Sequence, residues 1–342
     1  MARDQRRADL RGTGVGDRRE PRTDFSDITV AVLGGLVMDV FVRTPQLPEW
    51  GQAVQAERLE IHPGGKGLNQ AIAASRLGAR VCAIGAVGQD AFGDQILQEL
   101  VANRVDVAGV SIIAKATTPV TLVFSRPGGD ASFVGWKNSA GVPVDAALIE
   151  AQSSLIRFSD VLLSTLEVSP EAVSAALRIA KSGGATTVLN PAPPLERPNY
   201  QLADLPLDQV EILVPNEWEA RELAGKRGAA KYSVREVASF LGSLGAKRVC
   251  ITRAHNGCSF LKGRTFREYD AYETEADDTT GASDAFCATL ALHLRGGYET
   301  EEAIHQAQAA GAWAVTKQGA GRHMPTIDQL NTHRDYLEGL KS

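Results

Sequence analysis

Seven consecutive residues, Asp278-Thr279-Thr280-Gly281-Ala282-Ser283-Asp284, have types and spacing that could do chemistry. They stand directly before apolar residues at helical spacing, and Gly296 and Gly297 close that pattern. Small residues at a helix start leave the first backbone N–H groups unobstructed, and the helix dipole makes them an anion site. A carboxylate in the same turn, Asp284, suits a site where a hydroxyl loses a proton beside a phosphate. The stretch therefore predicts phosphoryl transfer.

A second glycine-rich stretch, Gly64-Gly65-Lys66-Gly67-Leu68-Asn69, opens a predicted helix over residues 68–77. Glycines there let another molecule approach the backbone closely, and Asn69 can hydrogen-bond a polyol hydroxyl. A flexible turn before a helix is the alternative. The joint presence of both stretches favours a functional site.

Single acidic side chains follow two predicted strands. Asp39 comes after the first strand, and Glu167 follows the apolar run over residues 161–166. Ligands of open α/β sheets bind at the carboxyl ends of the strands, so both carboxylates are candidates for ligand binding. Each is equally consistent with a turn former or a helix cap.

Two further segments suit a nucleotide. Asn216 and Glu219 share one face of a helical turn and could position a hydrated Mg²⁺ and a phosphate. Taken alone, they favour a capping box, in which the Asn caps the helix and the Glu bonds back to it. The segment Thr252-Arg253-Ala254-His255-Asn256-Gly257 could cradle phosphates or form a plain hairpin loop.

These segments must be positioned by an alternation of apolar strands and longer helices. The expected strands cover residues 28–33, 81–86, 161–164, 187–189, 210–214 and 249–252, and the expected helices 68–77, 91–102, 146–156, 170–181, 234–244 and 301–316. This alternation predicts an α/β fold with a parallel sheet covered on both faces. Residues 40–61 and 120–136 are strands without helices between them, and we expect them to form a small sheet that acts as a lid.

The composition excludes several classes. A net charge of -5 gives no global attraction to nucleic acid or anionic membranes, and no apolar run is long enough to span a bilayer. The four cysteines form no C-x-x-C pair, which favours reduced thiols in a cytoplasmic protein. Residues 1–25 mix arginines with acidic residues and have few large apolar ones, so we expect a disordered tail.

Taken in order, these segments resemble the ribokinase-like family of sugar kinases, which are carbohydrate kinases of the phosphofructokinase-B type. The family signatures are similar to residues 64–71 and 278–286, and the resemblance runs from about residue 28 to residue 337. It implies a three-layer α/β/α domain over residues 26–342, with a mostly parallel sheet and lid strands from about 40–62 and 117–137. Within the family, ribokinase is the most similar.

The resemblance implies a role for each candidate residue. Asp284 would be the base, and the turn Gly281, Ala282 and Ser283 would stabilise the transferring phosphoryl group. The sugar would be held by Val37, Asp39, Gly65, Lys66, Gly67, Asn69, Glu167 and Asp284. ATP would be bound by Asn216, Thr252, Arg253, Ala254, His255, Asn256, Gly257, Ser283 and Gln308. Glu219 would order the water shell of Mg²⁺, and Asp278, Thr280, Ala314, Lys317, Gly319 and His323 would surround a K⁺ ion.

Three residues depart from the family pattern. Ser283 replaces a glycine that usually precedes the base, but helical angles remain open to serine. Val37 stands where ribokinase has a sugar-contacting asparagine, and an apolar side chain cannot satisfy a ribose hydroxyl. His323 stands where a hydroxyl residue would help ligate K⁺.

The sequence thus predicts a kinase that transfers the γ-phosphoryl group of ATP to a primary hydroxyl of a small sugar, ribose first. A nucleoside or fructose kinase of the same family is the alternative, and a non-catalytic sugar or nucleotide sensor is an alternative of another class. We expect small-molecule ligands, no nucleic-acid or membrane partner, and a homodimer formed through the lid strands, whose edges need cover.

Overall fold

The computed structural model describes residues 24–126, 131–136, 141–193, 201–225, 232–276, 279–316 and 320–339. A nine-stranded sheet runs through its centre in the order β13-β12-β11-β10-β9-β8-β1-β4-β5. The strands are β1 (Thr29–Leu33), β4 (Arg80–Gly88), β5 (Asp106–Ile113), β8 (Val161–Thr165), β9 (Thr186–Asn190), β10 (Ile212–Leu213), β11 (Arg248–Thr252), β12 (Cys258–Lys262) and β13 (Thr265–Tyr269). The neighbours from β5 to β11 are parallel, and β12 and β13 add an antiparallel edge.

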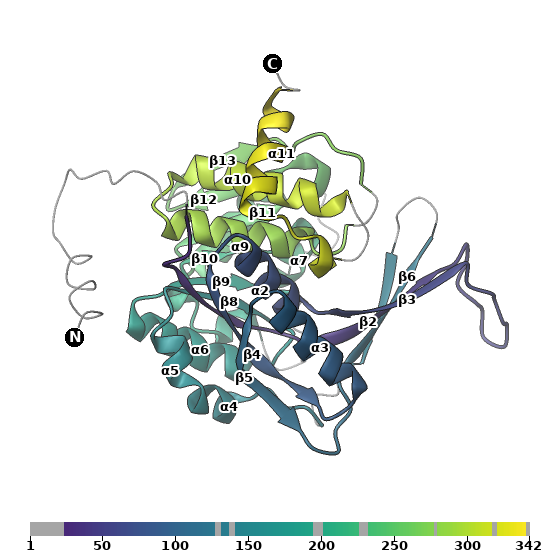
Figure 1. Ribbon diagram of the computed structural model, residues 1–342. Helices are drawn as coiled ribbons and strands as arrows, with labels where there is room; N and C mark the ends of the chain where they lie inside the picture. Colours follow the sequence, from purple (N-terminus) through teal and green to yellow (C-terminus); the bar gives the residue numbers. More distant parts are fainter. Residues whose placement is uncertain are drawn as a thin grey trace.

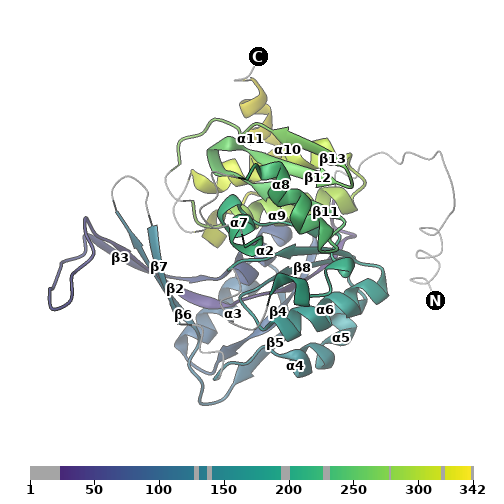
Figure 2. The ribbon, with the colours of Figure 1, turned by 180° about the vertical axis from the view of Figure 1, so that it is seen from behind.

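Helices cover both faces of this sheet (Figure 1 and Figure 2). One layer holds α2 (Lys66–Arg76), α3 (Ala91–Ala102), α9 (Ala282–Arg295), α10 (Thr300–Val315) and α11 (Ile327–Gly339). The other holds α4 (Ala146–Ala151), α5 (Ser153–Arg157), α6 (Pro170–Gly183), α7 (Glu217–Leu223) and α8 (Val234–Ser243). Within β1, Val30 and Val32 pack toward the first layer, while Ala31 and Leu33 pack toward the second. This is the predicted three-layer α/β fold.

Local sequence explains why the helices begin and end where they do. In α6 the Oγ of Ser169 accepts a hydrogen bond from Ala172 N at 3.1 Å, and Pro170 occupies the first turn. Gly184 ends the helix with a φ of 82°, a left-handed angle that glycine adopts without steric cost. Ser at the cap, Pro in the first turn and Gly after the end are the usual helix boundaries.

A second sheet of four strands stands off the central one, to the right in Figure 1 and to the left in Figure 2. It has the order β3-β2-β6-β7, from β2 (Val37–Arg43), β3 (Arg58–Gly64), β6 (Val120–Ser125) and β7 (Ala131–Trp136). We call it the lid. The predicted small sheet from two separate insertions is confirmed.

The two faces of the lid differ in chemistry. The register pairs Val40 with Ile61 and with Leu122, which in turn pairs with Val134. Side chains alternate between the faces of a sheet, so this row defines one apolar face, which we call the outer face. Its other members are Val42, Leu59, Phe124 and Trp136. The opposite face, the inner face, carries Asp39.

Some predicted elements differ from the structure. The strand expected at 210–214 is only Ile212–Leu213, and a 3₁₀ turn, η3 (Leu207–Gln209), precedes it. The helix expected at 146–156 breaks at Gln152 into α4 and α5. Phe25, placed in the disordered tail, is 1% exposed and joins the core, with its ring 4.9 Å from that of His293. Residues 1–23 of that tail lie outside the described residues.

No helix in the described ranges combines the length and the apolar character needed to cross a bilayer. All four cysteines are free thiols, and Cys250, Cys258 and Cys287 are buried.

Candidate active site

The candidate site lies where the chain order of the central sheet reverses. β1 has β4 on one side and β8 on the other, so the loops after β1 and β8 leave the same edge in different directions. Crevices at such switch points are the usual ligand sites of open α/β sheets. Gly34 and Gly35 follow β1, and Glu167 follows β8.

Glu167 joins these loops to the start of α2. Its Oε2 accepts hydrogen bonds from Gly35 N at 3.0 Å and from Lys66 N at 2.9 Å. The N-cap of α2 is Gly65, which has a φ of 93° and no side-chain cap of its own. The carboxylate therefore caps α2 from another element, in addition to its predicted place in the sugar site.

The glycines of this turn are required by close backbone contact. A Cβ on Gly67 would lie 2.6 Å from Gly34 C, and one on Gly65 would lie 2.5 Å from Gly35 O. A side chain at either position would separate the turn from the loop after β1. The turn predicted to hold the sugar is thus packed against the carboxyl edge of the central sheet.

Asp284 lies in the first turn of α9 and is 2% exposed. Its Oδ2 accepts a hydrogen bond from Asn69 Nδ2 at 3.1 Å, and its Oδ1 accepts one from Gln70 Nε2 at 3.0 Å. The preceding Gly281 is the N-cap of α9, with a left-handed φ of 83° that glycine tolerates. The structure therefore brings both glycine-rich stretches together at the candidate base.

Asp284 belongs to a group of four ionisable side chains that interact with one another. Burial raises the pKa of Asp284, and Lys66 and the two amide donors oppose this only in part. Burial likewise raises the pKa of Glu167 and of Glu219 against the opposing effect of Lys66. Burial lowers the pKa of Lys66, but the negative charges of Asp284, Glu219 and Glu167 outweigh it, so the net pKa is raised. The group is best described as one coupled cluster.

One buried acceptor in the site has no hydrogen-bond partner among the described residues. Asn69 uses its Nδ2 on Asp284, while its Oδ1 makes no hydrogen bond within the described part of the chain. The 3₁₀ turn η5 (Ala320–His323) packs over α2 here, and a Cβ on Gly321 would lie 2.9 Å from that oxygen. Leaving a buried acceptor unpaired is costly, so this atom suits a hydroxyl donor from a polyol.

The lid places Asp39 next to the same turn. Asp39 is 7% exposed, and a Cβ on Gly64 would lie 1.9 Å from its Oδ2. Val37 pairs with Gly64 in the register of β2 and β3, and its Cγ2 would lie 3.2 Å from a Cβ on Gly65. Both predicted sugar-site residues of β2 therefore border the glycine turn.

The candidate nucleotide side begins at α7. Asn216 Oδ1 accepts from Glu219 N at 2.7 Å, and Glu219 Oε2 accepts from Asn216 N at 2.8 Å. This is the capping box that the pair alone favoured. An isolated parallel bridge joins Asn216 to Thr252, so the start of α7 lies beside the end of β11. Glu219 also interacts electrostatically with Lys66 and Asp284, which links the metal candidate to the base.

The segment from Thr252 to Gly257 is a hairpin loop between β11 and β12, built on η4 (Ala254–Asn256). Its glycine is required, because a Cβ on Gly257 would lie 1.9 Å from Tyr269 O. Ala254 has a φ of 49°, which is uncommon for a residue with a side chain. Such outliers cluster at ligand-binding sites.

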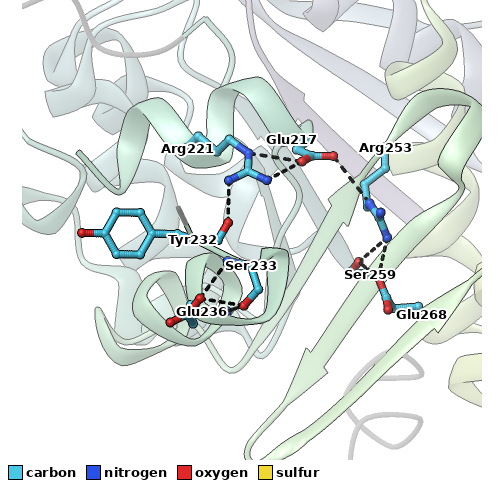
Figure 3. A network of polar contacts seen from close by, with 8 residues as sticks. All are labelled: Glu217, Arg221, Tyr232, Ser233, Glu236, Arg253, Ser259 and Glu268. Carbon is cyan, nitrogen blue, oxygen red and sulfur yellow. Dashed lines mark hydrogen bonds and ion pairs between the residues drawn. The ribbon is translucent and has the colours of Figure 1, made fainter. Parts of the chain in front are cut away.

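Arg253 is held by acidic groups (Figure 3). Its Nη1 donates to Glu268 on β13 and lies 3.3 Å from Ser259 Oγ, and its Nε lies 3.5 Å from Glu217 Oε2 on α7. Glu217 also pairs with Arg221 one turn along α7. The Arg253 side chain therefore fixes the loop against α7 and β13.

Two other parts of the predicted ATP site, Gln308 and the anion turn, make hydrogen bonds within the protein. Gln308 Nε2 donates to the carbonyls of Tyr269 and Asp270, at 3.3 Å and 3.0 Å, and so holds the chain after β13. In the anion turn, Asp284 N donates to Gly281 O at 3.0 Å, and Ala282 N lies 3.4 Å from Thr279 O. Ser283 lies in the first turn of α9 and is not among the residues with positive φ, so its backbone is helical, as serine allows.

Part of the predicted K⁺ site lies outside the described residues, namely Asp278, Lys317 and Gly319. Of the rest, Thr280 precedes α9, and Ala314 is buried near the end of α10. The carbonyl of His323 accepts a hydrogen bond from Trp313 Nε1 at 2.8 Å.

The sequence analysis assigned no role to Gln70, although its amide contacts the candidate base. The residue belongs to the quoted glycine-rich signature, and its place directly after Asn69 was the available signal. Its direction could not be read from that pattern, because the contact joins α2 to α9 across a long stretch of chain.

Comparison with known proteins identifies the class. A model of the pfkB family of carbohydrate kinases matches residues 27–327. The chain therefore belongs to the pfkB family. This confirms the predicted family, the fold class and the reaction, which is the ATP-dependent phosphorylation of a hydroxyl group of a sugar.

Individual relatives are similar over nearly their whole length. The ribokinase of Staphylococcus aureus is 31% identical over 306 residues, which cover 88% of this chain and 98% of that protein. The structure of Arabidopsis thaliana ribokinase complexed with ribose and ATP has a TM-score of 0.78 at 24% identity, and the match covers 90% of this chain and 98% of that one. A putative ribokinase II from E. coli, in complex with ATP and Mg²⁺, has a TM-score of 0.74 at 23% identity, with 90% and 99% covered.

Proposed function

We propose that this protein transfers the γ-phosphoryl group of ATP to the primary hydroxyl of a small sugar, with ribose as the preferred acceptor. The observation that carries the proposal is the contact of Asp284 with Asn69 and Gln70. It joins a buried carboxylate at a helix N-terminus to the turn that suits a polyol. The similarity to ribokinases supports ribose.

The chemistry follows from the atoms at the junction. Asp284 would take the proton of the acceptor hydroxyl, because its raised pKa brings a carboxylate closer to the operating pH of a general base. The free Oδ1 of Asn69 would accept from another sugar hydroxyl. The amides at the start of α9 and the ammonium of Lys66 would stabilise charge that develops on the transferring group.

Mg²⁺ fits the residues at the start of α7. One carboxylate oxygen of Glu219 accepts a hydrogen bond from Asn216 N. Burial raises the pKa of Glu219 because it disfavours the charged carboxylate, and a divalent cation nearby would stabilise that charge. The described ranges contain no group of three or more candidate ligands, which agrees with a Mg²⁺ that keeps most of its water and is held through ATP. When bound, the ion would neutralise phosphate charge; Glu219 would orient its water shell.

We further propose a K⁺ ion beside the anion turn, a homodimer, and action in the cytoplasm. A Cβ on Gly311 would lie 3.5 Å from Ala282 O, so the carbonyl-rich end of α10 lies near the start of α9.

The outer face of the lid exposes Leu59, Val134 and Trp136, by 59%, 57% and 52%. An apolar sheet face of this kind needs cover, and a second lid would supply it. The free cysteines fit a reducing compartment.

A panel of acceptors tests the proposal. Phosphorylation rates on ribose, 2-deoxyribose, fructose and nucleosides would be measured with and without K⁺, by following ADP. We expect the highest kcat/KM on ribose and stimulation by K⁺. A higher value on another acceptor would replace ribose, and the apolar Val37 on the inner face of the lid favours this alternative. Binding of sugar without ADP formation for every acceptor would favour the non-catalytic sensor.

A further inference from the structure

The inner face of the lid carries a polar residue, His62, that has no role in the proposed reaction. In the register of β2 and β3, Asp39 pairs directly with His62, and Val37 pairs with Gly64. Directly paired residues project from the same face of a sheet. His62 therefore stands beside Asp39, on the side of the lid that borders the glycine turn, one pair further out than Val37.

The hydrogen bonds of His62 define what its ring can still do. Nε2 lies 2.7 Å from Glu60 Oε2, and this contact lowers the pKa of Glu60 against the opposing effect of burial. The ring is flanked by Phe41 at 6.1 Å. Nδ1 is buried and makes no hydrogen bond among the described residues. If Nε2 carries the proton shared with Glu60, Nδ1 is a hydrogen-bond acceptor held in a fixed direction.

The surroundings of His62 connect its strand to the candidate sugar site. The turn η5 packs against both β3 and α2. At its β3 side, Arg322 acts electrostatically on Glu60, and at its α2 side Gly321 lies against Asn69 Oδ1. Two buried acceptors that lack a partner among the described residues, Asn69 Oδ1 on α2 and His62 Nδ1 on β3, thus lie on the two elements that η5 contacts.

We propose that His62 is a specificity-determining residue, whose Nδ1 accepts a hydrogen bond from a hydroxyl of the acceptor sugar. The inference rests on the proposed function and deepens it. Val37 offers the acceptor no polar contact, and His62 supplies one at the next same-face pair along the lid. The site therefore selects a polyol with a hydroxyl at the Asp39 end, and rejects acceptors that carry hydrogen or an apolar group there.

Three variants separate this role from a structural one. His62→Ala removes Nδ1, and we expect the acceptor KM to rise about 5- to 150-fold, the range for loss of one buried hydrogen bond. The KM for ATP should stay within about twofold. His62→Asn keeps an acceptor atom near the position of Nδ1 and should restore most of the affinity. His62→Gln places its polar atoms near Nε2 and should not.

A matched control is His333→Ala on α11, because its Nε2 is also buried without a hydrogen bond in the described part of the chain. It should leave the acceptor KM unchanged. Deoxy analogues identify the hydroxyl: one analogue should have the same KM with wild type and with His62→Ala. An acceptor KM within twofold of wild type for His62→Ala, or equal rises for acceptor and ATP, would overturn the inference. A wild type that phosphorylates no sugar would instead refute the proposed function.

Discussion

Replacing the candidate base is the sharpest test of the site. Asp284→Asn removes the proton acceptor and keeps the side-chain volume. In the native site both carboxylate oxygens accept from amides, at 3.1 Å from Asn69 and 3.0 Å from Gln70. The new amide would oppose one of these donors, but Asn69 Oδ1 has no partner among the described residues, so Asn69 can turn over to accept from it. A sugar hydroxyl can then accept from Asn69 Nδ2 instead of donating to Oδ1. The hydrogen-bond network should therefore survive.

Loss of the Asp284 charge should change the rate of the reaction and the stability of the fold in different ways. General-base assistance contributes about 10²–10⁴ in rate, or about 2.7–5.4 kcal/mol at 1.36 kcal/mol per decade, and kcat should fall by that factor. Stability should not fall. A carboxyl group whose folded pKa is raised destabilises the fold once pH exceeds its unfolded pKa, so removing it relieves a cost at neutral pH. Glu167 and Glu219 remain to hold the charge of Lys66.

The assay is kcat at saturating sugar and ATP, with sugar affinity from calorimetry and Tm as the control for folding. We expect a loss of rate of at least a hundredfold, with sugar affinity and Tm nearly unchanged. In the wild type, the acid limb of the rate profile should lie above the ordinary range of aspartate, because burial raises the pKa of Asp284 within its coupled cluster. A kcat within about threefold of wild type would refute the assignment of the base.

Three further changes probe the lid and the loop. Gly64→Ala would place a Cβ 1.9 Å from Asp39 Oδ2, so the acceptor KM should rise about tenfold or more. The control Gly135→Ala, whose Cβ would meet nothing closer than 3.9 Å, should not change it. Arg253→Ala frees the hairpin loop from α7 and β13, and the KM for ATP should rise about three- to tenfold with the sugar KM unchanged; an equal rise in both would contradict this. Trp136→Glu puts a charge on the outer face of the lid, and light scattering at micromolar concentration should detect monomers; a persistent dimer would exclude that interface.

Periodicity and end signals were sufficient for most of the fold. The helix expected at residues 91–102 has those bounds in the structure, and α6 begins at Pro170 as predicted. Failures came where the main chain changes direction within a predicted element. Gln152 ends one short helix and begins another, and β10 retains only two of the five residues expected in its strand. Neither predicted element, 146–156 or 210–214, contains a glycine or proline that would have marked the break.

The candidate site was predicted in type but less well in its connections. The two glycine-rich stretches could be paired from the sequence, because each has its own local signature. The contacts of Gln70 with Asp284 and of Glu167 with the start of α2 join distant elements, so no local pattern specifies them. Arg253 illustrates the same limit, since its partners Glu217 and Glu268 are on α7 and β13 and no local pattern specifies them.

The topology of the lid has a consequence for how the chain acquires its activity. β2 and β6 are parallel neighbours, yet α2, β4, α3 and β5 all lie between them in the chain. Contacts of such long sequence separation form slowly, because loop-closure entropy must be overcome first. A chain leaving the ribosome therefore completes β4 and β5 before Asp39 can reach its place. Refolding should restore helical signal first and sugar binding afterwards.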